Sequence, residues 1–108
     1  VDDMASAALH IMNLGSMAYQ QKTTPRRSHL NVGTGIDCSI KELTETIRDV
    51  VGYTGHVRWD VSKPDGAPRK LMNSNKLASL GWRPRFSLKD GLVDAYRWYL
   101  ANLPLARQ

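Results

Sequence analysis

One short segment, residues 63–70, carries a denser set of chemically active side chains than the rest of the sequence. It reads Lys-Pro-Asp-Gly-Ala-Pro-Arg-Lys, with three cationic groups, one carboxylate and two prolines that restrict the backbone. Lys and Arg donate charge-assisted hydrogen bonds to phosphate oxygens, and a carboxylate accepts hydrogen bonds from ribose hydroxyls. The segment therefore suits a nucleoside diphosphate, and a solvated polar turn explains its composition equally well.

Other reactive centres find little support. No Cys or His residues have the spacing of a zinc site, and the three histidines lie far apart in the sequence (His10, His29, His56). The sequence contains neither a Gly-x-Ser-x-Gly elbow nor a Walker loop. We therefore expect no metal site in this chain.

The segment Asn31-Val-Gly-Thr-Gly35 is similar to part of a dinucleotide-binding fingerprint but lacks its third glycine. The next helix cap comes four residues after Gly35, at Ser39, so the backbone would not bring a helix N-terminus directly to a pyrophosphate. We interpret the segment as a turn from a strand into a helix.

Three single residues have both a chemical and a structural interpretation. Asp2 and Asp3 could act as a general acid/base pair, but adjacent helical residues do not face each other, and the position favours capping. Cys38 precedes a helix N-terminus that would lower its pKa, but it has no basic neighbour, so we predict a small buried residue.

The three tryptophans are weighed in the same way. We predict that Trp82 and Trp98 pack in the interior or at a hinge. Only Trp59, near the basic segment, is a candidate for contact with a ligand.

The predicted elements that position these residues are helix, strand, helix, strand and two further helices. Ser39-Ile-Lys-Glu42 has the pattern of a capping box, and Gly52 suits the left-handed position at the end of that helix. The first predicted helix runs from Asp3 to about Gln21, and Pro25 follows it as a helix breaker. Strands are predicted at 29–33 and 56–60, with a turn at 63–66. A short helix at 75–80 is closed by Gly81, and the last helix runs from Ser87 to about Leu103, followed by Pro104.

Composition bounds the class of protein. The chain has 108 residues, 42% of them hydrophobic and 23% charged, which is typical of one small globular domain. It has no apolar run long enough to span a bilayer, and its single cysteine excludes an internal disulfide. The net charge of +5 favours anionic partners. Because the sequence opens Val-Asp-Asp, without an initiator Met or a signal segment, we expect a piece of a longer protein.

Several segments together resemble the C-terminal third of the GDP-L-fucose synthases, a family of extended short-chain dehydrogenase/reductases. The Lys-Pro-Asp-Gly-x-Pro-Arg-Lys string is specific to that branch, whereas Asn-Val-Gly-Thr-Gly and Leu-Gly-Trp occur in many extended reductases that act on nucleotide sugars. The matching pieces cover essentially the whole chain: Val1-Asp-Asp-Met-Ala5, Asn31 to Gly35, Cys38 to Leu43, Val50 to Gly55, Ser62 to Leu71 and Leu80-Gly-Trp82.

The resemblance implies an α/β (α+β) fragment: a helix-rich C-terminal substrate-binding region at residues 1–108, with a small sheet of short strands and without the N-terminal Rossmann domain. It implies that the intact enzyme epimerises GDP-4-keto-6-deoxymannose at C3 and C5 and reduces C4 with NADPH. The Tyr-x-x-x-Lys pair of such reductases is absent. It requires a Lys four residues after the Tyr, whereas Lys22 comes only three residues after Tyr19. We expect no catalytic residue and no bound NADP in this piece, and an intact enzyme that is a cytoplasmic homodimer without membrane or nucleic-acid partners.

By resemblance, the basic segment binds the substrate. Lys70 would neutralise the GDP diphosphate and Asp65 would contact the ribose, with Lys63 and Arg69 as weaker candidates from the same loop. His56 is a further candidate, standing where close bacterial relatives often carry Arg. A second departure is Asn73, which replaces a usual Asp and would weaken a cap or a local ion pair.

Two other functions stay open. The chain could belong to a sister enzyme that uses another nucleotide sugar, although the Lys-Pro-Asp-Gly order disfavours it. It could also be a small basic nucleic-acid-binding module, an interpretation drawn from the net charge and from Arg26-Arg27, without a recognised binding motif.

Overall fold

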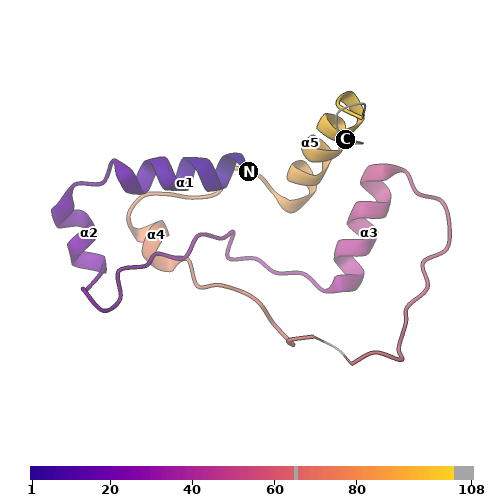
Figure 1. The fold of residues 1–108 in the computed structure, drawn as a ribbon, viewed down its shortest axis with the longest axis horizontal. Coiled ribbons are helices and arrows are strands. Elements are labelled where there is room, and N and C mark those ends of the chain that lie inside the picture. Colours follow the sequence, from indigo (N-terminus) through magenta and orange to yellow (C-terminus); the bar gives the residue numbers. More distant parts are fainter. Residues whose placement is uncertain (65, 104–108) are drawn as a thin grey trace. The chain divides into compact units, whose positions relative to one another are not determined.

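The computed structural model describes residues 1–64 and 66–103, which form two compact units. The first unit contains Val1–Asp37 and Arg69–Arg85, and the second contains Cys38–Pro68 and Phe86–Gln108. Figure 1 labels the helices of the described part: α1 (Asp2–Met12), α2 (Ser16–Lys22), α3 (Ile40–Val51), α4 (Asn75–Ser79) and α5 (Leu88–Ala101). None of these helices has both the length and the apolar character needed to cross a membrane.

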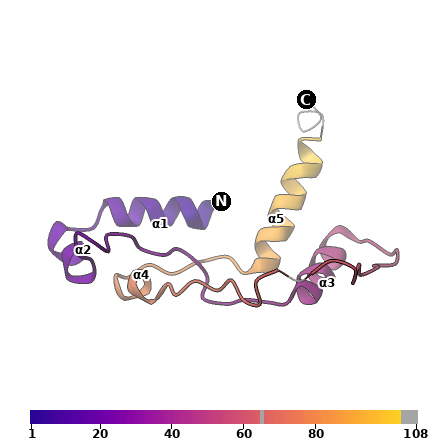
Figure 2. The same cartoon turned by 60° about the horizontal axis from the view of Figure 1, so that its bottom comes forward.

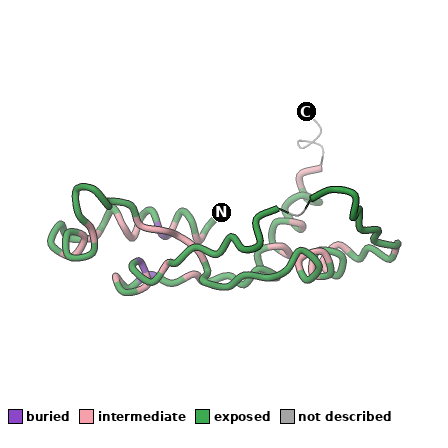
Figure 3. The backbone as a smooth tube through the Cα atoms, turned by 90° about the horizontal axis from the view of Figure 1, so that it is seen from below, coloured by how far each residue is buried: buried purple, intermediate pink, exposed green. Residues whose placement is uncertain are grey.

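The first unit is organised around a small apolar cluster between α1 and α4. Ala7, Leu77 and Trp82 are buried, and Ile11, Leu30 and Val32 pack against them. The Trp82 indole N–H donates to the Ser6 hydroxyl over 3.0 Å, which satisfies its polar atom. Burial is otherwise rare in the described residues (Figure 3).

The helix predicted from Asp3 to Gln21 is interrupted. α1 ends at Met12 and α2 begins at Ser16, with the change of direction visible in Figure 2. The Asn13 amide donates to the Leu9 carbonyl over 2.8 Å, and Gly15 has an extended backbone. The low helix propensity of glycine explains the break. α2 then ends at Lys22, before Pro25, as expected.

The predicted cap of α1 is wrong. Val1 occupies the N-cap position, and the structure has no side-chain cap there. Asp2 and Asp3 lie inside the first turn, where their charges still face the positive end of the helix dipole. The Asp3 carboxylate instead accepts the Arg85 backbone N–H, with both oxygens 3.1 Å from the nitrogen.

Neither predicted strand, 29–33 or 56–60, forms in the described part of the chain. Leu30 and Val32 both pack on the core of the first unit, whereas Asn31 between them donates to the Asn73 carbonyl. A strand also needs a neighbouring backbone to pair with. The only bridge among the described residues joins Thr24 and Arg27 across a tight turn.

The second unit contains α3 and α5, which pack against each other. The capping box is confirmed: the Glu42 backbone N–H donates to the Ser39 hydroxyl over 3.2 Å, and Ser39 N–H donates to the Glu42 carboxylate over 2.7 Å. Gly52 ends α3 with φ +69°, the left-handed conformation predicted from the sequence. Ser87 caps α5 by accepting the Asp90 backbone N–H over 3.1 Å.

Three smaller predictions concern the short helix at 75–80, the turn at 63–66 and Pro104. The short helix at 75–80 is confirmed as α4, with Gly81 at φ +96° after it. The predicted turn at 63–66 includes Asp65, which lies outside the described residues, so this turn stays a prediction. Just before it, Val61 and Ser62 form a turn in which the Asp60 carboxylate accepts the Ser62 backbone N–H over 3.0 Å. Pro104 lies outside the described residues.

Candidate functional site

A groove of about 290 Å³ lies on the second unit, between one face of α3 and the segment that follows it. Its walls combine cationic, hydroxyl and aromatic side chains with one carboxylate. The lining residues are Lys41, Thr44, Glu45, Arg48, Gly55, His56, Val57 and Trp59.

Local sequence explains why these residues meet. Lys41, Thr44 and Arg48 are three and four positions apart, so a helix places them on one face. Gly52 ends the helix and allows the chain to turn. Gly55 then passes close to the Tyr53 ring, so a Cβ atom there would require the half-exposed Tyr53 side chain to move.

The groove is suited to an anion that carries a flat group. The Lys41 ammonium is 3.9 Å from the Glu45 carboxylate, whereas Arg48 has no ion-pair partner in the described part of the chain. Trp59 is 50% exposed, so its ring is available for stacking. His56, the one predicted site residue in this groove, thus lies beside two cationic side chains and a tryptophan.

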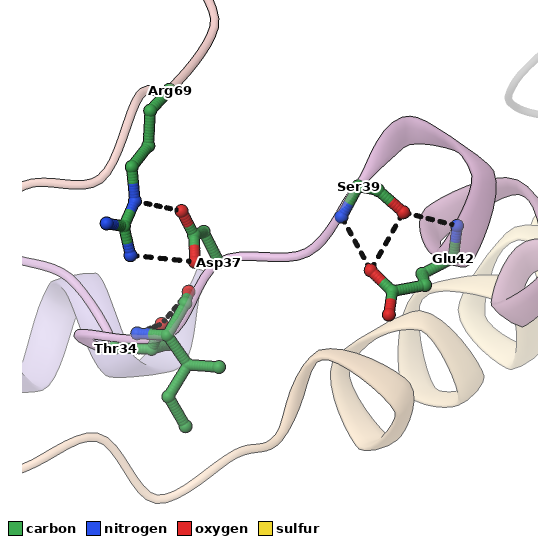
Figure 4. A network of polar contacts seen from close by, with 6 residues as sticks. Thr34, Asp37, Ser39, Glu42 and Arg69 are labelled. Atoms are coloured by element: carbon green, nitrogen blue, oxygen red, sulfur yellow. Dashed lines mark hydrogen bonds and ion pairs between the residues drawn. The ribbon is translucent and has the colours of Figure 1, made fainter.

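A second polar site lies on the first unit, where residue 69 meets the glycine turn at 33–37. The Arg69 Nε donates to the Asp37 carboxylate over 2.7 Å, and a terminal nitrogen of the same guanidinium contacts the second oxygen at 3.4 Å (Figure 4). This arrangement is a fork that grips both oxygens of one carboxylate.

The ion pair shifts the protonation of both partners. The hydrogen bond from Arg69 lowers the pKa of the Asp37 carboxyl below its ordinary value of 3.8. The same bond raises the pKa of Arg69. In the second unit, hydrogen bonds from the Ser62 hydroxyl and backbone N–H lower the pKa of Asp60.

The other predicted site residues remain predictions. Lys63 and Lys70 are exposed and form no hydrogen bond or ion pair among residues 1–64 and 66–103. Asp65 lies outside the described residues. Of the five candidates, the structure therefore places Arg69 in an ion pair and His56 in a groove.

Sequence reasoning missed Asp37 and the helical wall of the groove. The helical wall could have been predicted from the spacing of Lys41, Thr44 and Arg48, which places them on one helix face. No local pattern could have identified Asp37, because its partner Arg69 lies 32 positions away in the sequence. The Asn73 amide oxygen accepts the Asn75 backbone N–H over 3.0 Å, which is a local turn contact, because the N-cap of α4 is Ser74 and α4 has no side-chain cap.

Two other expectations about single residues are wrong. Cys38 is exposed rather than buried. Trp98 is 62% exposed, although Trp82, at 8%, is in the core as predicted.

The described residues contain no cluster of His, Cys, Asp or Glu that could hold a metal ion.

Comparison with known proteins decides the family. The chain is 52% identical to GDP-L-fucose synthase of Escherichia coli K12 over 102 aligned residues. The aligned region covers 94% of this chain and 32% of that enzyme. It is 49% identical over 108 residues to a putative GDP-L-fucose synthase 2 of Arabidopsis thaliana, covering 100% of this chain and 30% of the relative. The chain belongs to the GDP-L-fucose synthase family.

The chain spans about a third of the length of these curated relatives of the GDP-L-fucose synthase family. Among solved structures, a GDP-6-OMe-4-keto-L-xylo-heptose reductase from Campylobacter jejuni is similar, with a TM-score of 0.81 and 35% identity over 94% of this chain and 29% of that one. A GDP-mannoheptose C4 reductase from the same organism, solved with NADP bound, has a TM-score of 0.75 and 35% identity over 92% of this chain and 29% of its own. No family model matches the sequence.

Proposed function

We propose that this chain is the nucleotide-sugar-binding part of a GDP-L-fucose synthase. The observation that carries the proposal is the 52% identity to the Escherichia coli enzyme over 94% of this chain. The intact enzyme would epimerise GDP-4-keto-6-deoxymannose at C3 and C5 and reduce the C4 ketone with NADPH. This chain would contribute the groups that bind the nucleotide.

The basic loop would hold the diphosphate. Lys70 is exposed and unpaired in the described part, so its ammonium is available to a phosphate oxygen. Lys63 and Arg69 would add positive charge, and Asp65 would accept a hydrogen bond from a ribose hydroxyl. By the resemblance, His56 is a further candidate for contact with the nucleotide, and within the second unit it lines the same groove as Trp59.

The residues of this chain do not fit NADP. The glycine turn at 33–37 does not lead directly into a helix N-terminus, because α3 begins only at Ile40. The first turn of α3 is closed by the Ser39–Glu42 capping box, whose carboxylate also disfavours an anion. The sequence lacks the Tyr-x-x-x-Lys pair, so we propose that the remainder of the enzyme supplies both the cofactor site and the catalytic residues.

Calorimetric titration of the chain with GDP and with UDP tests the binding function. We expect GDP to bind more tightly than UDP, because the proposed site belongs to a GDP-sugar enzyme. Equal affinity for the two nucleotides would contradict the proposal. Salt-sensitive binding to random DNA, with neither nucleotide bound, would favour the alternative of a nucleic-acid-binding module.

A turnover assay tests the reaction. NADPH oxidation by the longer polypeptide that contains this chain should require GDP-4-keto-6-deoxymannose, and the product should be GDP-L-fucose by NMR. The 108-residue chain alone should oxidise no NADPH.

A second substrate deserves the same assay. Two similar solved structures are described as reductases of GDP-linked heptoses. If the longer polypeptide reduces a GDP-4-keto-heptose and leaves GDP-4-keto-6-deoxymannose untouched, the sister-enzyme interpretation replaces the proposed one.

A further inference from the structure

Arg69 stands immediately before Lys70 in the basic loop, residues 63–70. Its side chain joins this loop to another segment of the chain. Both contacts of its guanidinium go to the carboxylate of Asp37, at 2.7 and 3.4 Å. The tie joins positions 32 residues apart in the sequence. It therefore restrains the backbone at the point where the loop ends.

The acidic partner is itself held in place by its own segment. Gly35 adopts φ +76°, a conformation that favours glycine, and so turns the chain toward Asp37. The Thr34 hydroxyl accepts the Ile36 backbone N–H over 3.2 Å and donates to the Ile36 carbonyl over 3.0 Å (Figure 4). These contacts order the residue before Asp37.

We propose that Asp37 is a positioning residue for nucleotide binding. By gripping the Arg69 guanidinium it fixes the backbone beside Lys70, so that the Lys70 ammonium is presented to the diphosphate without first being ordered by the ligand. This inference rests on the proposed function. It assigns Arg69 to loop anchoring rather than to direct contact with phosphate.

The two roles of Arg69 make opposite predictions for Asp37→Asn. If Arg69 binds phosphate directly, removal of the nearby negative charge frees the guanidinium, and the anionic substrate binds equally well or more tightly. If Asp37 anchors the loop, the variant loosens the loop and weakens binding, even though the site has become more positive. The sign of the change therefore separates the roles.

The experiment uses steady-state kinetics of the longer polypeptide that contains this chain. We expect Asp37→Asn to raise KM for the GDP-sugar about two- to fivefold, the range that loss of an exposed ion pair can produce. The values of kcat and KM for NADPH should not change. A merely structural defect would move all three values together.

Two variants serve as controls. Asp90→Asn removes a carboxylate that accepts a hydrogen bond from the Ser87 hydroxyl at the start of α5, away from every proposed binding residue, so KM should remain at the wild-type value. The double variant Asp37→Arg with Arg69→Asp reverses the ion pair. It should return KM toward the wild-type value, whereas each single change raises it.

The outcomes separate the two proposals. A wild-type enzyme that turns over the GDP-sugar, with an unchanged or lowered KM in Asp37→Asn, overturns the positioning function and leaves the proposed function intact. A reversed pair that stays as weak as Arg69→Asp alone also overturns it, since Arg69 then contacts substrate itself. A wild-type enzyme that neither binds nor turns over any GDP-sugar overturns both proposals.

Discussion

Lys70 and Arg69 are neighbours with different surroundings. Arg69 is held by a carboxylate, whereas Lys70 is exposed and forms no ion pair in the described residues. Two adjacent cations in a phosphate-binding loop need not share a function, because a guanidinium grips one carboxylate with two donors while an ammonium acts as a point charge.

The first prediction concerns Lys70→Ala in the longer polypeptide. The diphosphate lies away from the reacting sugar carbons, so its charge hardly changes along the reaction and its contacts contribute uniform binding. A charge-assisted hydrogen bond is worth about 1.5–3 kcal/mol, so KM for the GDP-sugar should rise roughly 10- to 150-fold. Steady-state kinetics should show kcat little changed, and an abolished kcat with unchanged KM would contradict the assignment.

Asp65→Asn should show a milder rise in KM, because an amide still accepts a hydrogen bond.

The second prediction concerns the protonation of Asp37. The folded pKa is lowered by Arg69, so the ion pair is present above the ordinary value of 3.8 and is lost only as pH falls through the lowered folded value. In Arg69→Gln, the pKa of the Asp37 carboxyl should rise toward 3.8. Carboxyl carbon NMR titration measures it. Asp60 is the internal control, since its pKa is lowered by Ser62 and should not move.

At the scale of elements, α3 and α5 show how much of a helix boundary is local. The Ser39 and Ser87 caps and the end of α3 at Gly52 depend on residues within a few positions, and all three were predicted from the sequence. The caps join backbone groups to side chains that are already nearby, so no distant segment has to be known.

The predicted strands and the first helix show the opposite case. Residues 29–33 have the alternation of a strand, but a strand is defined by its partner, which no local pattern names. The first helix breaks at Gly15, whose backbone is extended and whose helix propensity is low. In the candidate site, the Arg69–Asp37 pair escaped prediction for the same reason as the strands, since its halves are far apart in the sequence.

A pair of glycine substitutions tests the account of these helices. A Cβ atom at Gly52 or at Gly91 would meet nothing within 4 Å, so only the backbone differs between them. Gly52→Ala should destabilise the chain by about 1–2 kcal/mol, because alanine resists a left-handed backbone. Gly91→Ala, inside α5, should stabilise it by up to about 1 kcal/mol. Denaturant unfolding measures both, and equal effects of the same sign would contradict the account.

At the scale of the whole chain, the amount of apolar surface in contact with water is notable. The buried hydrophobic residues of the described part are Ala7, Leu77 and Trp82, whereas many large apolar side chains are exposed, including Met12, Ile36 and Trp98. Monomeric proteins rarely leave so much of their hydrophobic content uncovered.

We therefore predict that the 108-residue chain self-associates in isolation. Apolar surface that has no intramolecular partner is removed from water by contact between copies. Sedimentation velocity should show oligomers whose share grows with concentration, and a dye that binds apolar surface should become fluorescent. A monomer at high concentration without dye binding would contradict this prediction.

The three tryptophans have different surroundings, so their intrinsic fluorescence should report on the two units separately. Trp82 belongs to the first unit and is buried, so it should emit at the blue edge, while Trp59 and Trp98 belong to the second unit and should emit toward the red. Unfolding of the first unit would shift the blue component alone. A nucleotide that stacks in the groove should quench the Trp59 emission, and this quenching should vanish in Trp59→Phe but persist in Trp98→Phe.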